Sequence, residues 1–187
     1  MNRTLPWLIA LLGLPLPPPD PPARLALLPI ELINLHKTPP DSSLAPRIQA
    51  LASALQDRLQ AACGYQLVAV DSTAWADADR GVGYIYDHPD VAAGLAAAVG
   101  ADWVIIPRLN RATAWVADLQ AHVVRVRDTA LVSNRVVELK GLELGPELAA
   151  RLEDRGAAWM ADQLSQVIEL AEHPNATPAR RCPPNAP

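Results

Sequence analysis

The sequence predicts a mixed α/β protein with a sheet of about five strands, in the order β-α-β-α-β-β-β-α, and a long C-terminal helix. Strand-like apolar runs alternate with helical patterns in the first half of the chain. Two valine-rich runs then follow each other with no helix of useful length between them, as antiparallel neighbours do. Only three of the 19 prolines lie between residues 47 and 173, so this part can hold regular structure. Helices on one or both faces would give a two-layer or three-layer sandwich.

The first two strands and the helix between them follow from apolar patterning. Residues 24–35 are apolar on both faces, as in a covered parallel strand, although Pro29 removes one backbone donor and predicts a bulge or an edge there. After a loop, Ser43 can cap a helix whose apolar residues recur at helical spacing up to Gly64. Residues 65–72 predict the second strand.

The middle of the chain predicts a short helix and a third strand. Residues 73–90 form the least regular part, after which Pro89 opens a helix that ends at Gly100. The third strand covers 102–113. The inner face of the helix is expected to consist of Val91, Leu95, Ala98 and Val99.

The last part predicts a meander and a long helix. The valine-rich runs over 115–129 and 131–142 are expected to extend the sheet. Pro146 begins the final helix, which could break at Gly156. Its inner face is expected to contain Leu148, Leu152, Trp159, Met160, Leu164, Val167, Ile168 and Ala171.

The composition and the N-terminal segment indicate in which compartment the protein resides and which class of partner is excluded. A net charge of −4 and a pI near 5.5 argue against a nucleic-acid partner, which needs a clustered basic surface. Arg3 precedes an apolar stretch too short to span a bilayer, so residues 1–23 are interpreted as a secretory signal or as a Pro-rich arm of a cytosolic protein. We expect a soluble periplasmic protein with no membrane span in the mature chain, a single α/β domain over 24–173 and a disordered Pro-rich tail over 174–187.

The two cysteines leave two interpretations open. An even count in an exported protein permits a disulfide between Cys63 and Cys182, which would attach the tail to the body of the domain. In the alternative, Cys63 is a small buried apolar residue and Cys182 is a free thiol.

Two groups of residues are candidates for binding. Arg108, Asn110 and Arg111 follow the apolar run of the third strand and could hold a carboxylate or phosphate. The chain continues directly into another strand, however, which favours a solvated hairpin over a ligand site. The aromatic residues of the irregular segment could contact a partner protein or plug the end of the sandwich, and they are Trp75, Tyr84 and Tyr86.

The sequence offers little for catalysis or cofactor binding. The four histidines are scattered and no serine lies in a G-x-S-x-G turn. The acidic residues between 77 and 90 match no EF-hand spacing. We therefore expect no catalytic residue, no metal site and no cofactor, although residues distant in sequence can still cluster in space.

Short motifs resemble those of an uncharacterised family of small secreted bacterial proteins. They are Leu28 to Leu32, Gly100 to Asp102, Arg127–Asp128, Gly141 and Trp159. The same strand order is distantly similar to the N-terminal domain of TolB, to CsgG-like curli secretion proteins and to lipoprotein activators of penicillin-binding proteins.

This resemblance implies a periplasmic, non-catalytic adaptor or accessory protein that binds another envelope protein. An exposed sheet edge, residues 73–90 or both would provide the contact. The alternative is a small-ligand (anion) binding module, and a hydrolase built from dispersed residues comes third.

Overall fold

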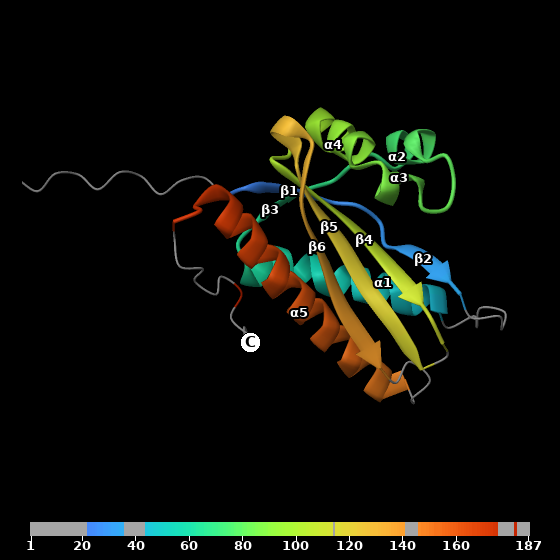
Figure 1. The fold of residues 1–187 in the computed structure, drawn as a ribbon. Helices are drawn as coiled ribbons and strands as arrows, with labels where there is room; N and C mark the ends of the chain where they lie inside the picture. Colours follow the sequence, from blue (N-terminus) through green and yellow to red (C-terminus); the bar gives the residue numbers. More distant parts are fainter. Residues whose placement is uncertain (1–21, 36–43, 114, 141–145, 176–181, 183–187) are drawn as a thin grey trace, which may run out of the picture.

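The computed structural model describes residues 22–35, 44–113, 115–140, 146–175 and 182, and it places a six-stranded sheet between two layers of helices (Figure 1). Three predicted features lie outside the described residues: the signal or arm, except for residues 22 and 23, the Ser43 cap and most of the tail. The elements in chain order are β1 (Arg24–Leu27), β2 (Glu31–Asn34), α1 (Leu44–Asp57), η1 (Arg58–Ala62), β3 (Gln66–Val68), α2 (Ser72–Ala78), α3 (Tyr84–Asp87), α4 (Pro89–Ala98), β4 (Trp103–Arg111), β5 (Val116–Arg125), η2 (Val126–Asp128), β6 (Ala130–Lys140) and α5 (Pro146–Glu172).

The sheet is mixed, which confirms the predicted fold class. Its strand order is β3-β1-β4-β5-β6, and β2 pairs with β4 beyond the end of β1. The first four strands pair in parallel, whereas β4, β5 and β6 form the antiparallel meander expected from the valine-rich runs. Among the described helices, none is long and apolar enough to cross a membrane.

Pro29 divides the predicted first strand into β1 and β2. Leu27 pairs with Ile105 and Glu31 with Arg108, so four steps along the N-terminal strand span three steps along β4. The one extra residue is the bulge expected at a proline that lacks a backbone N–H.

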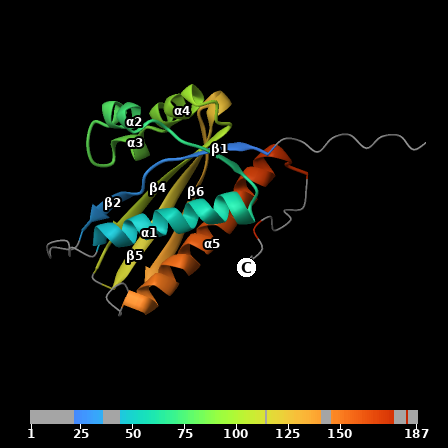
Figure 2. The same cartoon turned by 180° about the vertical axis from the view of Figure 1, so that it is seen from behind.

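Helices cover both faces of the sheet, so the sandwich has three layers. Figure 2 shows α1 and α5 side by side on one face, and α2, α3 and α4 lie on the other. The helix α4 meets the sheet through its alanines, which are Ala92, Ala93 and Ala96, and not through the valines and leucine predicted for its inner face. Small side chains let a helix approach a sheet closely, and this packing outweighs the burial of the larger residues nearby.

The long helix α5 is continuous, so the break considered at Gly156 is absent. Gly156 is buried, and a methyl group added there would collide with the Leu139 side chain on β6. This glycine therefore allows a close approach of helix and strand. Trp159, predicted on the inner face, is 62% exposed, because the buried stripe passes through Ala157, Met160, Ala161 and Leu164 and leaves position 159 outside it.

The segment over 73–90 is more regular than its composition suggested. Asp71 caps α2, and its Oδ1 accepts the backbone N–H groups of Thr73 and Ala74, both at 2.9 Å. A turn with positive φ at Gly83 then leads into α3.

Candidate functional site

Arg108 lies at the centre of a cluster that ties α3 to the sheet. Its Nε donates to Glu31 Oε2 at 3.1 Å and its Nη2 donates to the Gly83 carbonyl oxygen at 3.3 Å. The guanidinium carbon lies 3.7 Å from the centre of the Tyr86 ring. Glu31 in turn accepts the Gly83 N–H, and the side chain of Arg108 is mostly buried. Partners within the chain therefore occupy much of the binding capacity of Arg108.

Tyr86 lies between Arg108 and His122. The rings of Tyr86 and His122 stack with their centres 3.8 Å apart, and His122 Nδ1 lies 3.1 Å from the Tyr86 carbonyl oxygen. The Tyr86 hydroxyl donates to Asn134 Oδ1 at 3.3 Å. Burial raises the pKa of Tyr86 and lowers the pKa of His122, so both groups favour their neutral forms.

The three aromatic residues considered for partner contact occupy different environments. Tyr86 is only 6% exposed and fills the space between α3 and the sheet. Trp75 is half-buried against the core beneath α4. Tyr84 stacks on His88 with ring centres 4.1 Å apart and lies under Arg80.

The structure does not bring the three polar residues of the third strand together. Arg108 and Asn110 lie on the face that carries α3, whereas Arg111 points to the opposite face, where it is buried beside the Arg47–Glu153 ion pair. Successive strand residues point to opposite faces, so positions 108 and 111 cannot form one clamp. A cavity lined by Glu31, Trp75 and Tyr86 measures only about 90 Å³, well below the size of typical ligand sites.

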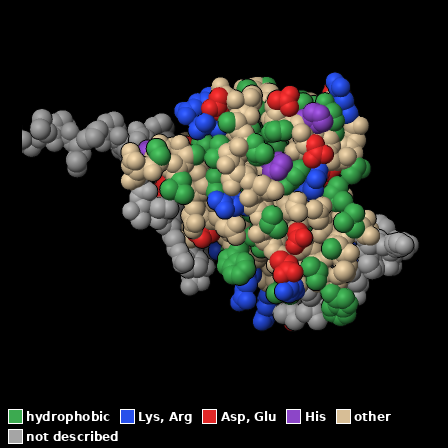
Figure 3. Space-filling model, viewed as in Figure 1, with side chains coloured by type: hydrophobic (Ala, Val, Ile, Leu, Met, Phe, Trp, Pro, Cys, Tyr) green, Lys and Arg blue, Asp and Glu red, His purple; other side chains and the backbone are tan. Residues whose placement is uncertain are grey.

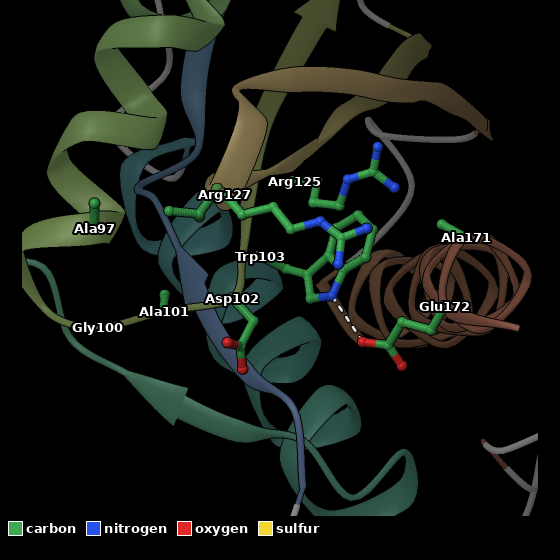
Figure 4. A pocket seen from close by; sticks show the side chains of 10 residues that line it. Ala97, Gly100, Ala101, Asp102, Trp103, Arg125, Arg127, Ala171 and Glu172 are labelled. Atoms are coloured by element: carbon green, nitrogen blue, oxygen red, sulfur yellow. Dashed lines mark hydrogen bonds between the residues drawn. The ribbon is translucent and has the colours of Figure 1, made fainter.

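A larger cavity of about 460 Å³ lies at the other end of β4 (Figure 4). Trp103 lines it and donates from Nε1 to Glu172 Oε1 at 2.9 Å. Asp102 Oδ2 accepts the backbone N–H of Arg24 at 2.8 Å. Arg125 and Arg127, from the end of β5 and the turn after it, also line the cavity.

Sequence reasoning missed this cavity because its residues come from five separate elements, α4, β4, β5, η2 and α5. Trp103 and Glu172 are 69 residues apart, and no local pattern indicates that they meet. The spacing of Arg125 and Arg127, two residues apart at a strand end, was the one available signal.

The structure joins Cys63 and Cys182 by a disulfide across a sequence separation of 119 residues. Both cysteines are 6% exposed, and Cys182 Sγ lies 3.7 Å from the Ala161 carbonyl oxygen on α5. The bridge therefore fixes position 182 between the end of η1 and the long helix. Among the described residues, no group of three or more His, Cys, Asp or Glu side chains could hold a metal ion.

The strand β6 forms a long edge of the sheet. Within the described part of the chain, β6 pairs with β5 alone, and all of its 11 residues except Val132, at a bulge, have a partner there. Leu131 and Val136 on this strand are 45% and 49% exposed. The face of the molecule in Figure 3 shows acidic, basic and apolar side chains intermixed, with no field of a single charge.

These features define a three-layer α/β protein with a long open sheet edge and a cavity at one end of the sheet. The chain belongs to the family DUF3280, described as "Protein of unknown function (DUF2380)", whose model matches residues 23–143. The match covers the sheet and its first helices and ends before α5.

The chain is also similar to several solved structures at low identity. The LpoB C-terminal domain from Salmonella enterica is 15% identical with a TM-score of 0.43, covering 63% of this chain and 82% of that one. A PelC dodecamer from Paraburkholderia phytofirmans is 14% identical with a TM-score of 0.47, covering 78% and 87%. TolB from Acinetobacter baumannii is 14% identical with a TM-score of 0.44, covering 83% of this chain and 29% of that one. No curated protein matches the chain.

Proposed function

We propose that this protein is a non-catalytic accessory protein of the bacterial periplasm, and that it binds an extended segment of another envelope protein along the edge of β6. The segment would add to the sheet as a further strand. Its backbone would supply most of the affinity, and its apolar side chains would pack beside the exposed residues of β6.

The length and sequence of β6 are the main support for this proposal. At 11 residues it is about twice as long as an average strand, and residues 130–140 contain no proline. Along an edge strand, every second residue directs its N–H and C=O away from the sheet. Native edges of this length are ordinarily protected by proline, a covering element, a bulge or inward-pointing charge, and of these β6 carries a bulge at Val132 and the partly buried Arg135.

The exposed apolar side chains of β6 favour a protein partner. Leu131 pairs with Val124 and Val136 pairs with Gln120, so both lie on the face that carries α4. Apolar side chains beside an open edge would contact alternate side chains of an added strand. The Glu138–Lys140 ion pair, at 2.9 Å, leaves the end of this strand with balanced charge. The partner segment is therefore expected to be aliphatic and β-branched rather than strongly charged.

The periplasmic location is supported by the chain's own sequence and by its disulfide. Arg3 and the apolar stretch behind it have the layout of an export signal. A disulfide between distant cysteines is stable in an oxidising compartment such as the periplasm.

A lysine substitution at the edge tests the proposal. The mature protein, with the variants Val136→Lys and Leu170→Lys, is used to capture partners from a periplasmic extract. Leu170 is the matched control because it is 40% exposed and lies on α5, outside both the β6 edge and residues 73–90. Lysine at the edge should weaken partner binding by at least about tenfold, because its ammonium group would have to be desolvated beside the added strand.

Hydrogen exchange of the complex identifies the mode of binding. If a strand adds to β6, the amide groups of residues 130–140 that point away from β5 become protected when the partner binds. A stoichiometric partner that leaves the exchange of β6 unchanged, or that binds the Val136→Lys variant as well as the Leu170→Lys variant, would contradict the proposal.

A further inference from the structure

We infer that the 460 Å³ cavity at the end of β4 binds a short peptide of two or three residues through its free amino and carboxyl termini. This site is separate from the β6 edge and does not depend on the function proposed for it. The cavity lies within the size range of small-molecule sites.

The charges that line the cavity are divided between two sides. Figure 4 shows Arg125 above the Trp103 indole and Arg127 reaching across it, with the carboxylates of Asp102 and Glu172 below, one to each side of the indole. A simple anion would be attracted by the arginines but repelled by the two carboxylates, and a simple cation would meet the reverse. A ligand that carries one positive and one negative end suits both sides at once.

The end of α5 strengthens the acidic side. Glu172 is the last residue of this 27-residue helix, and the C-terminal end of a helix carries partial negative charge. At the C-terminal end of α4, a backbone carbonyl group already has a cationic partner, because Arg24 Nη2 donates to the Val99 carbonyl oxygen at 2.9 Å. An ammonium group is therefore expected beside Glu172 and Asp102, and a carboxylate beside Arg127, because the Arg125 guanidinium is already paired with Asp128.

Three of the four charged groups, those of Glu172, Asp102 and Arg125, are held in place before any ligand arrives. The Trp103 indole, which is 2% exposed, fixes Glu172 by its hydrogen bond, and the backbone of Arg24 fixes Asp102. Arg125 is oriented by Asp128, which accepts from its Nε at 3.0 Å and from its Nη2 at 2.8 Å. A site with ordered charges loses less entropy on binding than a mobile one.

The apolar lining limits the size of the peptide side chains. The cavity is also lined by Ala97, Ala101 and Ala171, whose side chains are single methyl groups. They leave room for peptide residues that have small side chains.

Calorimetry with trialanine tests this inference on the full chain in its oxidised form. Trialanine with free termini should bind with a dissociation constant on the order of 0.1–1 mM. Trialanine that is N-acetylated, or that carries a C-terminal amide, should bind at least about tenfold more weakly, because each cap removes one of the two charges. In parallel, ¹⁵N NMR should show the Trp103 indole N–H resonance shifting as the free peptide is added.

Variants at exposed positions distinguish this site from other binding. Arg127→Gln and Glu172→Gln should each weaken the binding of trialanine about tenfold, and the glutamine at 172 keeps an oxygen that can accept the Trp103 N–H. Arg151→Gln on the exposed surface of α5 is the matched control and should bind as the parent does.

Three results would overturn the inference. They are no heat and no indole shift up to about 10 mM peptide, equal binding of free and capped peptides, and an equal loss of affinity in the Arg127→Gln and Arg151→Gln variants.

Discussion

Breaking the disulfide should remove much of the stability of the fold. The bridge closes a chain segment of 119 residues, and closing a loop of this length lowers the entropy of the unfolded chain by about 16 cal/mol/K, or about 5 kcal/mol at 25 °C. On reduction, the folded protein regains some freedom around Cys182, which offsets part of this effect. We therefore expect the free energy of unfolding to fall by about 3–5 kcal/mol, a large share of the 5–15 kcal/mol of an ordinary domain.

Urea unfolding of the oxidised and reduced protein, followed by circular dichroism, measures this loss. The Cys63→Ala/Cys182→Ala variant is the control, because it should match the reduced protein and should not respond to reductant. Free energies of unfolding that differ by less than about 1 kcal/mol between the oxidised and reduced protein would refute the reasoning from loop closure.

Three further predictions concern packing and protonation. Gly156→Ala should destabilise the protein by about 1–2 kcal/mol, because the added methyl group would overpack Leu139. Gly94→Ala, whose added methyl group meets nothing within 4 Å, should stabilise it by about 0.5–1 kcal/mol. Thermal unfolding compares the two variants, and stabilisation by both would contradict the close approach of α5 and β6. Trp159→Ser should change the free energy of unfolding by less than about 0.5 kcal/mol. Met160→Ala, at a fully buried position, should lower the free energy of unfolding by about 2–5 kcal/mol. A similarly large decrease for Trp159→Ser would show that Trp159 belongs to the core. Because burial lowers the pKa of His122 below 6.5, its contribution to stability is present above pH 6.5 and is lost as the pH falls through the folded pKa. The urea midpoint measured against pH should lose this dependence in the His122→Gln variant and keep it in the His88→Gln variant. Identical pH curves for the two variants would contradict the assignment to His122.

The element order could be predicted because long periodic segments signal their structure locally. The apolar stripe of α1, the valine-rich runs of β5 and β6 and the bulge at Pro29 all follow from short-range rules. The helices α2 and α3 were missed because helices of seven and four residues are too short to show a period. Asp71 was the available signal for α2, since a carboxylate before a helix-forming run is a common cap.

The residues by which each helix packs on the sheet were harder to predict than the helix itself. For α4, the most hydrophobic residues were predicted to face the sheet. In the structure the alanines pack against the sheet, because their small side chains permit a closer contact. For Trp159, a large aromatic residue beside an apolar stripe was assigned to the core, although its angular position excludes it.

The candidate sites depend on contacts between distant residues. Strand alternation is sufficient by itself to place Arg108 and Arg111 on opposite faces, because their positions differ by an odd number of residues. By contrast, the stacking of Tyr86 between Arg108 and His122, and the cavity around Trp103, require the register of three strands and the end of a helix at the same time.

The interior position of β1 in the sheet has a consequence for the order of folding. Of the described strands, β1 comes first in sequence, yet it is completed on one side by β3 and on the other by β4, where Leu25 pairs with Trp103. During synthesis, the sheet cannot close around β1 until about 80 more residues have left the ribosome, so the nascent chain carries an apolar strand without its neighbours. Such dependence on long-range pairing slows folding and leaves apolar strand surface exposed until β4 has been made.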